Sequence, residues 1–320
     1  MIDRNGSDTE RKVVEILKVL SESSQPLGSI AIARELEHHG VNLGDRAVRY
    51  HLRITDEQGY TQSLGRSGRA LTARGHEELR TALAPEQIGF ILEKLELLAF
   101  QTTFDPEKRV GDLPINTSLI DKERFPEVLA VMADAFRSGL CVSQLVAVAA
   151  EGESLGSVVV PRGRVGLATV CSAAINGVLL KSGVPVESRF GGLLEVRGPR
   201  PGRFVAVIEY AGTSLDPSEQ YIRSGMTSVS RMASSGEGKI LANFRELPAP
   251  SRSLAGERIA ALSEAGIGGV YALGDTSEPL CRIPVGLNRV GLVLLGGLNP
   301  VAVAVESGIA VDNISESGVI

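Results

Sequence analysis

The sequence is poor in cysteine and has no long apolar run, and both absences exclude whole classes of protein. Its three cysteines, Cys141, Cys171 and Cys281, lie far apart and show no metal-ligand spacing, so neither a disulfide framework nor a zinc site is expected. No segment approaches the roughly 18 uncharged apolar residues of a membrane span, and the polar, charged N-terminus is unlike a signal peptide. We therefore expect a cytoplasmic protein with reduced thiols.

Histidine is absent from residues 81–320, three quarters of the chain. The cysteines there have no evident base, and no glycine-rich phosphate motif of the Walker or GxGxxG type follows a predicted strand. Catalysis by a serine, cysteine or histidine therefore has little support. We expect a sensor without a cofactor rather than an enzyme.

The net charge of −5 is distributed unevenly. Residues 1–80 contain 12 basic and 12 acidic residues, whereas residues 43–74 contain six arginines against three acidic residues. The acidic excess lies in residues 81–320, with 21 basic against 26 acidic residues. A small basic surface on an acidic protein is typical of a regulator that reads specific DNA, and not of a protein that coats nucleic acid indiscriminately.

That basic stretch, residues 43–75, reads as a helix followed by a hairpin. Arg46, Arg49, Tyr50 and Arg53 recur at helical spacing and would share an exposed face that can enter a major groove, where arginine binds guanine or phosphate. The buried face is predicted to comprise Ala47, Val48, His51, Leu52 and Thr55.

The hairpin is predicted from strands at residues 60–64 and 70–72, with a glycine-bounded tip that carries Arg66 and Arg69. Two amphipathic helices, residues 9–23 and 29–39, precede the arginine-rich helix. Three helices and a hairpin are typical of a winged helix-turn-helix, and we assign residues 1–80 to a DNA-binding domain of this type. A winged helix used only for protein contacts stays open as an alternative.

The histidines of this domain give no metal site, because further ligands are not evident. His51 lies at the inner edge of the third helix, where packing and a phosphate contact are both open. His38 and His39 are expected only to end the second helix.

Residues 81–320 are predicted to form an α/β domain with an internal pseudo-twofold duplication. Residues 137–186 align without gaps onto residues 262–311 at a constant offset of 125, with Arg164 on Arg289 and Ser182 on Ser307. Alternating strands and helices in each copy favour helices packed on sheets. Besides the repeats, we expect helices at residues 85–100, 125–138 and 217–223, and strands at 116–120, 192–196, 204–210 and 239–245.

Three loops of this domain follow a predicted strand and precede a helix: residues 171–176, 211–217 and 296–300. Free backbone N–H groups and the helix dipole make such junctions suitable for an anion. Each loop by itself is also compatible with an ordinary turn capped by serine or aspartate. Three such loops in one domain favour at least one ligand site.

Several motifs in order resemble the NrpR family of archaeal nitrogen-responsive repressors. In the first domain they are GDRAVRYHL and the wing sequence GRSGRALTARG, and in the second TVCSAAINGVLLKSGVPV, FGGLLEV, EYAGTSLDP and GLVLLGGLNPVAVAVESGIAVDN. The resemblance covers nearly the whole chain. It implies a repressor of nitrogen-fixation and nitrogen-assimilation operons that binds a palindromic operator as a homodimer and is released by 2-oxoglutarate.

A dicarboxylate effector, which the resemblance implies, needs hydrogen-bond donors, and these are expected in and around the three loops. The residues expected to bind this effector are Thr169, Cys171, Ser172, Asn176, Arg189, Thr213, Ser214 and Asn299. Many members of the family carry two regulatory modules and this chain carries one, so a second NrpR-type chain is an expected further partner. A corepressor acting through such a partner, and an α/β enzyme with an accessory winged helix, are the alternatives to a stand-alone repressor.

Overall fold

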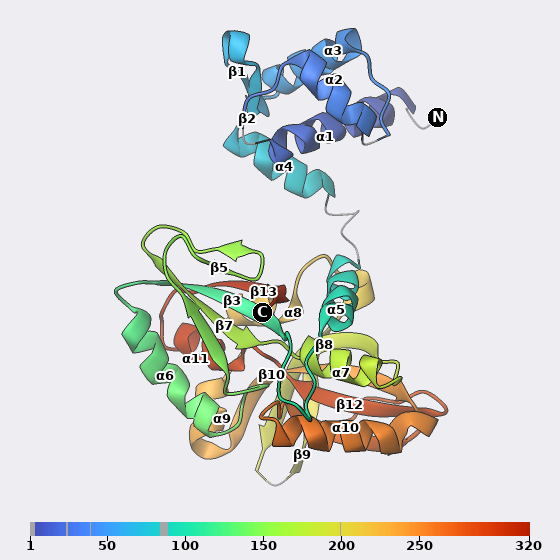
Figure 1. Cartoon of the computed structure of the whole chain (residues 1–320), viewed down its shortest axis with the longest axis vertical. Coiled ribbons are helices and arrows are strands. Elements are labelled where there is room, and N and C mark those ends of the chain that lie inside the picture. Colours follow the sequence, from blue (N-terminus) through green and yellow to red (C-terminus); the bar gives the residue numbers. More distant parts are fainter. Residues whose placement is uncertain (1–3, 24, 39, 84–88, 199) are drawn as a thin grey trace. The chain divides into compact units, whose positions relative to one another are not determined.

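Two units of the chain fold around separate cores, residues 1–87 and residues 88–320 (Figure 1). The computed structural model describes residues 4–23, 25–38, 40–83, 89–198 and 200–320. His39 and the first part of the helix expected at residues 85–100 lie outside the described residues. None of the helices within the described ranges is both long and apolar enough to cross a membrane.

The N-terminal unit has the element order of a winged helix. Its elements are α1 (Arg4–Glu22), α2 (Ser29–His38), α3 (Asp45–Glu57), β1 (Thr61–Ser63), the 3₁₀ turn η1 (Gly65–Ser67), β2 (Arg69–Leu71) and α4 (Ala73–Leu83). Strands β1 and β2 pair antiparallel with Thr61 opposite Leu71, and Leu27 forms an isolated bridge with Arg69. The predicted helix-and-wing order is confirmed, whereas α4 was not anticipated.

A single apolar core holds the three helices together. It contains Ile16 and Leu20 from α1, Ile32 and Leu36 from α2, and Leu52 from α3. These positions recur every three or four residues, so each helix turns one apolar stripe inward. The inner face predicted for α3 is confirmed at four positions, which are buried: Val48, His51, Leu52 and Thr55.

The C-terminal unit contains two larger antiparallel sheets. One has the order β13-β3-β7-β4 and the other the order β11-β12-β10-β8-β9. The strands of the first are β13 (Asp312–Val319), β3 (Pro114–Asp121), β7 (Arg164–Val170) and β4 (Val146–Ala149). Those of the second are β11 (Val270–Thr276), β12 (Arg289–Leu295), β10 (Glu237–Pro248), β8 (Glu187–Arg197) and β9 (Arg200–Glu209), and a small hairpin joins β5 (Ser154–Leu155) to β6 (Val158–Val159).

Helices cover these sheets in two groups, which Figure 1 shows at different ends of the unit. Helices α6 (Phe125–Arg137), α9 (Val229–Ser235) and α11 (Asn299–Glu306) pack on one another, while α7 (Ala173–Lys181) packs on α5 (Phe90–Gln101) and α10 (Arg252–Glu264). The short α8 (Pro217–Arg223) lies against β8 and β13. Buried side chains of the sheets, such as Phe244 and Leu292, fill two main apolar clusters between these layers.

The strand that directly follows each predicted repeat lies in the sheet of the other repeat. Strand β8 follows the first repeat and pairs with β10, which is next to β12 of the second, whereas β13 follows the second repeat and pairs with β3, which is next to β7 of the first. One ion pair accompanies each exchange: Arg164 lies 3.2 Å from Asp312, and Arg289 binds Glu187. In each pair the arginine begins β7 or β12, and the acidic residue begins β13 or β8.

The strand β13 is the main element that the sequence did not reveal. Its residues, DNISESGV, are polar and show no alternation of apolar and polar side chains, which is the usual strand signal. Four of its eight residues are buried, because the strand packs on β3, α5 and α8, and Ser157 donates to the Ser317 carbonyl at 2.7 Å. Tertiary contacts therefore override the local pattern.

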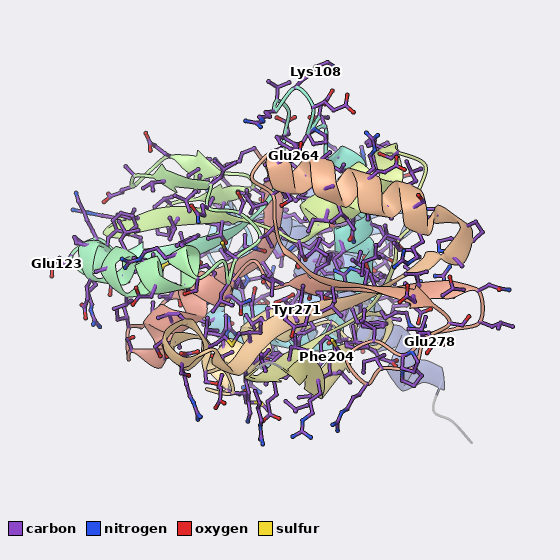
Figure 2. All side chains as sticks on the ribbon, turned by 90° about the horizontal axis from the view of Figure 1, so that it is seen from below. Lys108, Glu123, Phe204, Glu264, Tyr271 and Glu278 are labelled. Carbon is purple, nitrogen blue, oxygen red and sulfur yellow. The ribbon has the colours of Figure 1, made fainter. Side chains whose placement is uncertain are left out.

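A loop at the other end of this unit is also tied down by contacts distant in sequence. Lys108 lies on the 105–110 turn, close to Glu264 at the end of α10 (Figure 2). The side chain of Arg109 donates to the Glu264 carbonyl at 3.0 Å, and Arg258 pairs with Glu107 at 3.1 Å. These contacts hold the 105–110 turn in place before the chain enters β3.

Candidate functional site

The exposed face of α3 is the first candidate site. The side chains of Arg46, Arg49, Tyr50 and Arg53 are all exposed, as their helical spacing predicts. Arg49 donates to Asp45 one turn earlier, at 3.2 Å between Nε and Oδ1. A hydrogen bond from Ser29, followed by the Arg49 contact, lowers the pKa of Asp45. This carboxylate therefore joins the starts of α2 and α3 and orients Arg49.

The two arginines of the wing have different surroundings. Arg66, at the tip, is exposed. Arg69 is mostly covered and donates from Nε to Asp56 at 2.9 Å, and the same carboxylate accepts a hydrogen bond from Thr61 at 2.6 Å. The guanidinium of Arg69 thus fastens the wing to α3, and Arg66 is the wing arginine that faces solvent. A DNA contact by Arg69 stays a prediction that would require this ion pair to be shared or broken.

Glycine at position 68 is required by this attachment. Its φ is +106°, and a Cβ there would lie 2.4 Å from the backbone of Leu27. Leu27 and Arg69 exchange two backbone hydrogen bonds of 3.0 and 2.9 Å at this point. The wing is therefore fixed at its base, and the helix and wing tip together present four exposed arginines and a tyrosine. His51 is buried beneath Tyr50, with ring centroids 5.3 Å apart, which favours the packing role.

The second candidate site is a buried polar chamber in the C-terminal unit. The ends of all three predicted loops meet in it: Cys171 and Ser172 from the first, Asp216 from the second, Gly297 and Leu298 from the third. Its open space is ≈ 10 Å³, which is about room for one water molecule. The three loops predicted to favour a ligand site thus all contribute residues to this chamber.

Helices α7 and α11 begin at the chamber, so their first-turn N–H groups provide a partly positive wall. Gly297 is needed for this convergence, because a Cβ there would lie 2.5 Å from both the Asn116 side chain and the Val170 carbonyl. Asn116 and Asn243 project into the chamber from β3 and β10, the central strands of the two sheets. The site therefore lies where the two sheets and two helix starts approach one another.

Two acidic side chains are buried against this wall. Asp216, which caps α8, accepts from the Glu219 N–H and the Ser315 hydroxyl, both at 2.9 Å. Burial raises the pKa of Asp216 to about 6. Glu316 is 7% exposed, and burial together with the Asp216 carboxylate raises the pKa of Glu316 well above its usual range.

A buried arginine, Arg245, is the third charged residue near the chamber, besides Asp216 and Glu316. Arg245 on β10 is fully buried, with its guanidinium 5.1 Å from the centre of the Tyr210 ring. Its Nε and Nη2 have no hydrogen-bond partner among the described residues. The Tyr210 hydroxyl donates to Asn243 at 2.6 Å, and Asn243 donates to Ser172 at 3.1 Å, so a chain of hydrogen bonds spans the chamber. Two free N–H groups of a buried arginine are suited to a carboxylate.

Cysteine chemistry is not favoured at the chamber. Burial raises the pKa of the Cys171 thiol to about 12, and the charge of Glu316 adds to this effect. The reactive thiolate is therefore disfavoured, and Cys171 acts as a small, weakly polar wall residue. Within the part of the chain that is described, no three side chains of histidine, cysteine, aspartate or glutamate are grouped to hold a metal ion.

The remaining residues expected to bind an effector lie around the chamber rather than in it. Thr169 and Asn176 are buried nearby, and in the described structure the Thr169 hydroxyl and the Asn176 Oδ1 have no hydrogen-bond partner. Asn299 is used structurally, since it accepts from the Leu241 N–H at 2.8 Å and donates to its carbonyl at 3.0 Å. These three side chains surround the starts of α7 and α11.

Arg189, Thr213 and Ser214 are not brought to the chamber. Arg189 is half exposed at the start of β8 and pairs with Glu246 at 3.2 Å. The Thr213 hydroxyl accepts from the Leu215 N–H at 3.0 Å within a surface turn, and Ser214 is likewise part of that turn. Thr213 and Ser214 belong to the predicted loop at residues 211–217, but the part of that loop that reaches the chamber is Asp216.

Sequence reasoning missed the polar residues supplied by strands. These include Asn116 on β3 and Asn243 and Arg245 on β10, and the two residues of β10 interrupt an apolar run that forms a buried strand. A buried polar residue is costly unless it has a partner, so such interruptions are a usable signal. Ser315 and Glu316 gave no comparable signal, because the surrounding segment is polar throughout.

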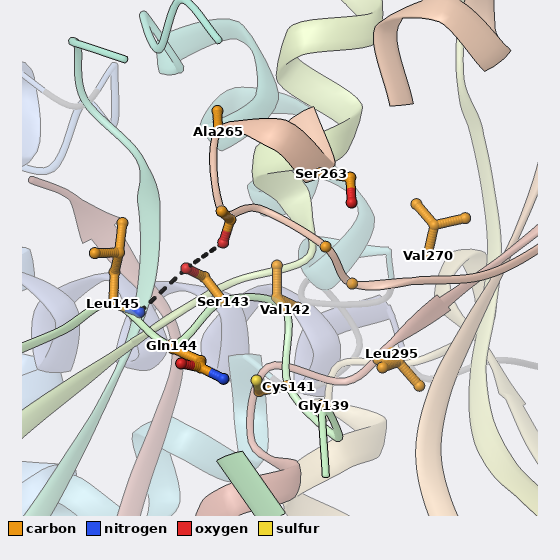
Figure 3. A pocket seen from close by; sticks show the side chains of 13 residues that line it. Gly139, Cys141, Val142, Ser143, Gln144, Leu145, Ser263, Ala265, Val270 and Leu295 are labelled. Carbon is orange, nitrogen blue, oxygen red and sulfur yellow. Dashed lines mark hydrogen bonds between the residues drawn. The ribbon is translucent and has the colours of Figure 1, made fainter. Parts of the chain in front are cut away.

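A larger cavity of this unit lies elsewhere and has a different character. It has a volume of ≈ 540 Å³ and lies between the segments that lead into β4 and β11. The Ser143 hydroxyl donates to the Gly266 carbonyl at 2.8 Å and accepts from the Leu145 N–H at 3.1 Å (Figure 3). No charged side chain lines this cavity, so it offers a dicarboxylate no counter-charge.

The fold and these two sites define a class of protein: a winged-helix regulator whose second unit is an α/β regulatory domain. A winged-helix family model, described as the ribonuclease R winged-helix domain, matches residues 14–79. The model described as NrpR regulatory domains NRD1 and 2 matches residues 88–320. The chain belongs to the NrpR family.

Named relatives agree with this assignment. The chain is 39% identical over 303 residues to the global nitrogen regulator NrpRI of Methanosarcina mazei, covering 95% of this chain and 93% of that protein. It is 33% identical to the global nitrogen regulator NrpR of Methanococcus maripaludis, covering 93% of this chain and 52% of that protein. The chain thus spans about half the length of the latter relative.

A solved structure supports the fold of the chain as well. The crystal structure of a nitrogen repressor-like protein from Methanococcus jannaschii matches with a TM-score of 0.60 and 27% sequence identity. The match covers 71% of this chain and 92% of that one. The sequence-based assignment to the NrpR family is confirmed, and the relatives are named as regulators of nitrogen metabolism.

Proposed function

We propose that this protein is a DNA-binding repressor of nitrogen-assimilation and nitrogen-fixation genes, and that it carries out no catalysis. Two copies would bind an inverted-repeat operator, each placing α3 in the major groove. Arg46, Arg49, Tyr50 and Arg53 would contact bases and phosphates, and Arg66 would hold the backbone from the wing. The observation that carries this proposal is the exposed arginine face of α3 on a winged helix in a chain of the NrpR family.

We further propose that 2-oxoglutarate releases the operator by binding at the polar chamber. The first turns of α7 and α11 border the chamber, and around it lie the N–H groups of Arg245 and the Oγ1 of Thr169 that have no partner among the described residues. Its ≈ 10 Å³ of open space is too small for a five-carbon dicarboxylate, so binding would require the loops to move apart. That movement supplies the second conformation that allosteric release needs.

An internal duplication of the regulatory domain is part of the same proposal. The order β13-β3-β7-β4 parallels the order β8-β10-β12-β11 when the repeats are offset by 125 residues. The ion pairs Arg164–Asp312 and Arg289–Glu187 obey that offset at both members. The chamber would then lie on the pseudo-twofold axis. Asn116 and Asn243 are 127 residues apart, but they stand opposite Thr169 and Leu294, which obey the offset of 125, so they take equivalent places in the two sheets.

The test is operator binding by the purified full chain, measured by gel shift on inverted-repeat DNA with and without 2-oxoglutarate. Replacing Arg49 and Arg53 by alanine should weaken binding by at least tenfold, since each base contact of this kind contributes about 1–3 kcal/mol. Arg137→Ala, an exposed arginine on α6, is the matched control. Binding that survives the double substitution would refute the role of α3, and binding unaffected by 2-oxoglutarate would refute the effector.

A corepressor that acts through a partner chain is the second candidate. It is favoured by one observation, that the chain spans about half the length of two named regulators, one of which is the NrpR of Methanocaldococcus jannaschii. Under this alternative the purified chain alone would not shift the operator, and Arg49→Ala would have little effect. Operator binding by the isolated chain would exclude it.

A further inference from the structure

The C-terminal strand leaves its ladder next to the polar chamber. Strand β13 pairs with β3 up to Ile314, opposite Thr117, and resumes at Gly318, opposite Ile115. Residues 315–317 therefore stand opposite the single residue Asn116 and form a bulge. At its centre Glu316 has a φ of +47°, a left-handed conformation that a glutamate rarely adopts. Bulges and such outliers gather at functional sites.

The bulge delivers a carboxylate to an environment built for anions. The Glu316 N–H donates to Asn116 Oδ1 at 3.1 Å, which turns the side chain into the chamber. The chamber also contains the first turns of α7 and α11, and the charge of Arg245 acts on Glu316. The side chain is buried, yet Glu316 Oε2 has no hydrogen-bond partner among the residues that the structure describes.

Two features make this carboxylate a poor permanent occupant. Asp216 is a like charge within the same chamber, and each of the two carboxyl groups raises the free-energy cost of ionising the other. The backbone at Glu316 is in an unfavourable region, so displacement of the bulge relieves strain. An incoming carboxylate would meet the charge of Asp216 as well, but it would find the same donors without the strained backbone of Glu316.

The bulge is also attached to α5, the first helix described after the N-terminal unit. The Lys94 ammonium of α5 donates to the Ser315 carbonyl at 2.7 Å, across 221 residues of sequence. Ser315 is held from the other side by α8, since its N–H donates to Glu219 at 2.8 Å. Leu95, the next residue of α5, lines the chamber. Movement of the bulge therefore changes the surroundings of α5 directly.

We propose that Glu316 is an internal substitute for the effector's carboxylate, and that the effector displaces the 315–317 bulge and thereby breaks the contact between Lys94 and Ser315. This inference rests on the proposed function, because it concerns the same chamber and its control of DNA binding. In the absence of effector, Glu316 occupies the anion site and the Lys94 contact holds α5. With effector bound, the bulge leaves the chamber and α5 is released.

The first test is Glu316→Gly in the full chain, with 2-oxoglutarate binding measured by isothermal titration calorimetry. Glycine tolerates the positive φ and removes the competing carboxylate, so the affinity for 2-oxoglutarate should rise about tenfold. Glu316→Gln keeps the volume without the charge and should give a smaller rise. Glu209→Gln, an exposed carboxylate on β9, should leave the affinity unchanged. Equal or weaker effector binding by Glu316→Gly, in a variant whose melting temperature shows that it is folded, would overturn the proposal.

The second test separates binding from its consequence. In Lys94→Met, 2-oxoglutarate should still bind, but its effect on operator affinity, measured by fluorescence anisotropy, should fall at least fivefold relative to the unaltered chain. Lys122→Met, an exposed lysine after β3, is the control and should behave like the unaltered chain. Full release of DNA by effector in Lys94→Met would refute the link through α5. If the unaltered chain itself does not respond to 2-oxoglutarate, it is the proposed function that fails, before any variant is considered.

Discussion

At the scale of single residues, the regulatory domain concentrates its unusual chemistry in one place. Asp216, Arg245 and Glu316 are charged side chains with almost no contact with solvent. Buried charges are expensive unless they are paired, and Arg245 and Glu316 both retain polar atoms without a described hydrogen-bond partner. The fold tolerates this cost at the chamber, which is why we regard it as functional rather than merely structural.

Asp216 gives a pH-dependent prediction. Burial raises its pKa from 3.8 to about 6, so between these values the folded state binds more protons than the unfolded state. Stability from this group is therefore greatest below about pH 4 and is lost as the pH rises to about 6. The unfolding free energy of the unaltered chain should fall as the pH rises from 4 to 7. In Asp216→Asn this fall should be smaller by about 3 kcal/mol.

Urea denaturation at pH 4 and pH 7 measures this difference. The exposed Asp275→Asn is the control, because that carboxylate is largely solvated and pairs only with Arg252. An equal loss of stability in Asp216→Asn and the unaltered chain would contradict the buried titration.

The two wing arginines give a second prediction at this scale. Arg69→Ala should destabilise the N-terminal unit by about 1–2 kcal/mol, because it leaves Asp56 without its charged partner. Arg66→Ala should leave the stability unchanged and weaken operator binding. Thermal melting and fluorescence anisotropy of both variants distinguish the two roles. The assignment would be wrong if Arg66→Ala lowered the melting temperature as much as Arg69→Ala does.

At the scale of elements, local patterns predicted those elements that have one apolar face. Helix α3 and the wing were predictable because Val48 and Leu52 lie one turn apart and glycines bound the tip. Helix α4 and strand β13 were not, since α4 follows the wing without a separate signal and β13 is polar. Their places depend on contacts with α1 and β3, which a single sequence does not reveal.

The candidate site, too, has some residues with a local sequence signal and others that depend on distant contacts. The loops at residues 171–176 and 296–300 were predictable, because glycine, serine and asparagine between a strand and a helix have a recognisable local role. Glu316 was not predictable, because its importance depends on a bulge that forms only when β13 meets Asn116 of β3. Partners 200 residues apart in sequence leave no local trace.

The attachment of the wing to the segment before α2 yields a prediction about an element. Gly68→Ala should detach the wing and cost about 2 kcal/mol or more, since the new Cβ meets the Leu27 backbone and the φ of +106° is unsuited to alanine. Gly28→Ala is a matched control, because a Cβ there has open space. Melting temperatures of the two variants decide the matter, and equal values would contradict a rigid wing base.

At the scale of the whole molecule, charge is divided between the units. A chain of net charge −5 has a local basic excess in residues 43–74, where four exposed arginines lie on α3 and the wing tip. Long-range attraction between this acidic protein and DNA is therefore limited, and specificity must come from close contacts.

The salt dependence of operator binding tests this view. If each head uses at most four arginines on phosphates, a dimer should show a slope of log K against log salt no steeper than about −7. Arg53→Ala should reduce the slope if Arg53 contacts a phosphate, and leave it unchanged if it contacts a base. A steeper slope in the unaltered chain would mean that cations outside α3 and the wing also bind DNA.

The pairing of β13 with the distant strand β3 affects how the C-terminal unit folds during synthesis. Strand β3 is synthesised about 200 residues before its neighbour β13. Until then β3 has one open edge, and the chamber lacks the wall that contains Ser315 and Glu316. Pairing of such distant segments is slow because a long loop must close first. A growing chain therefore lacks one wall of the chamber until β13 has been synthesised, and under the proposed function it cannot respond to an effector before that point.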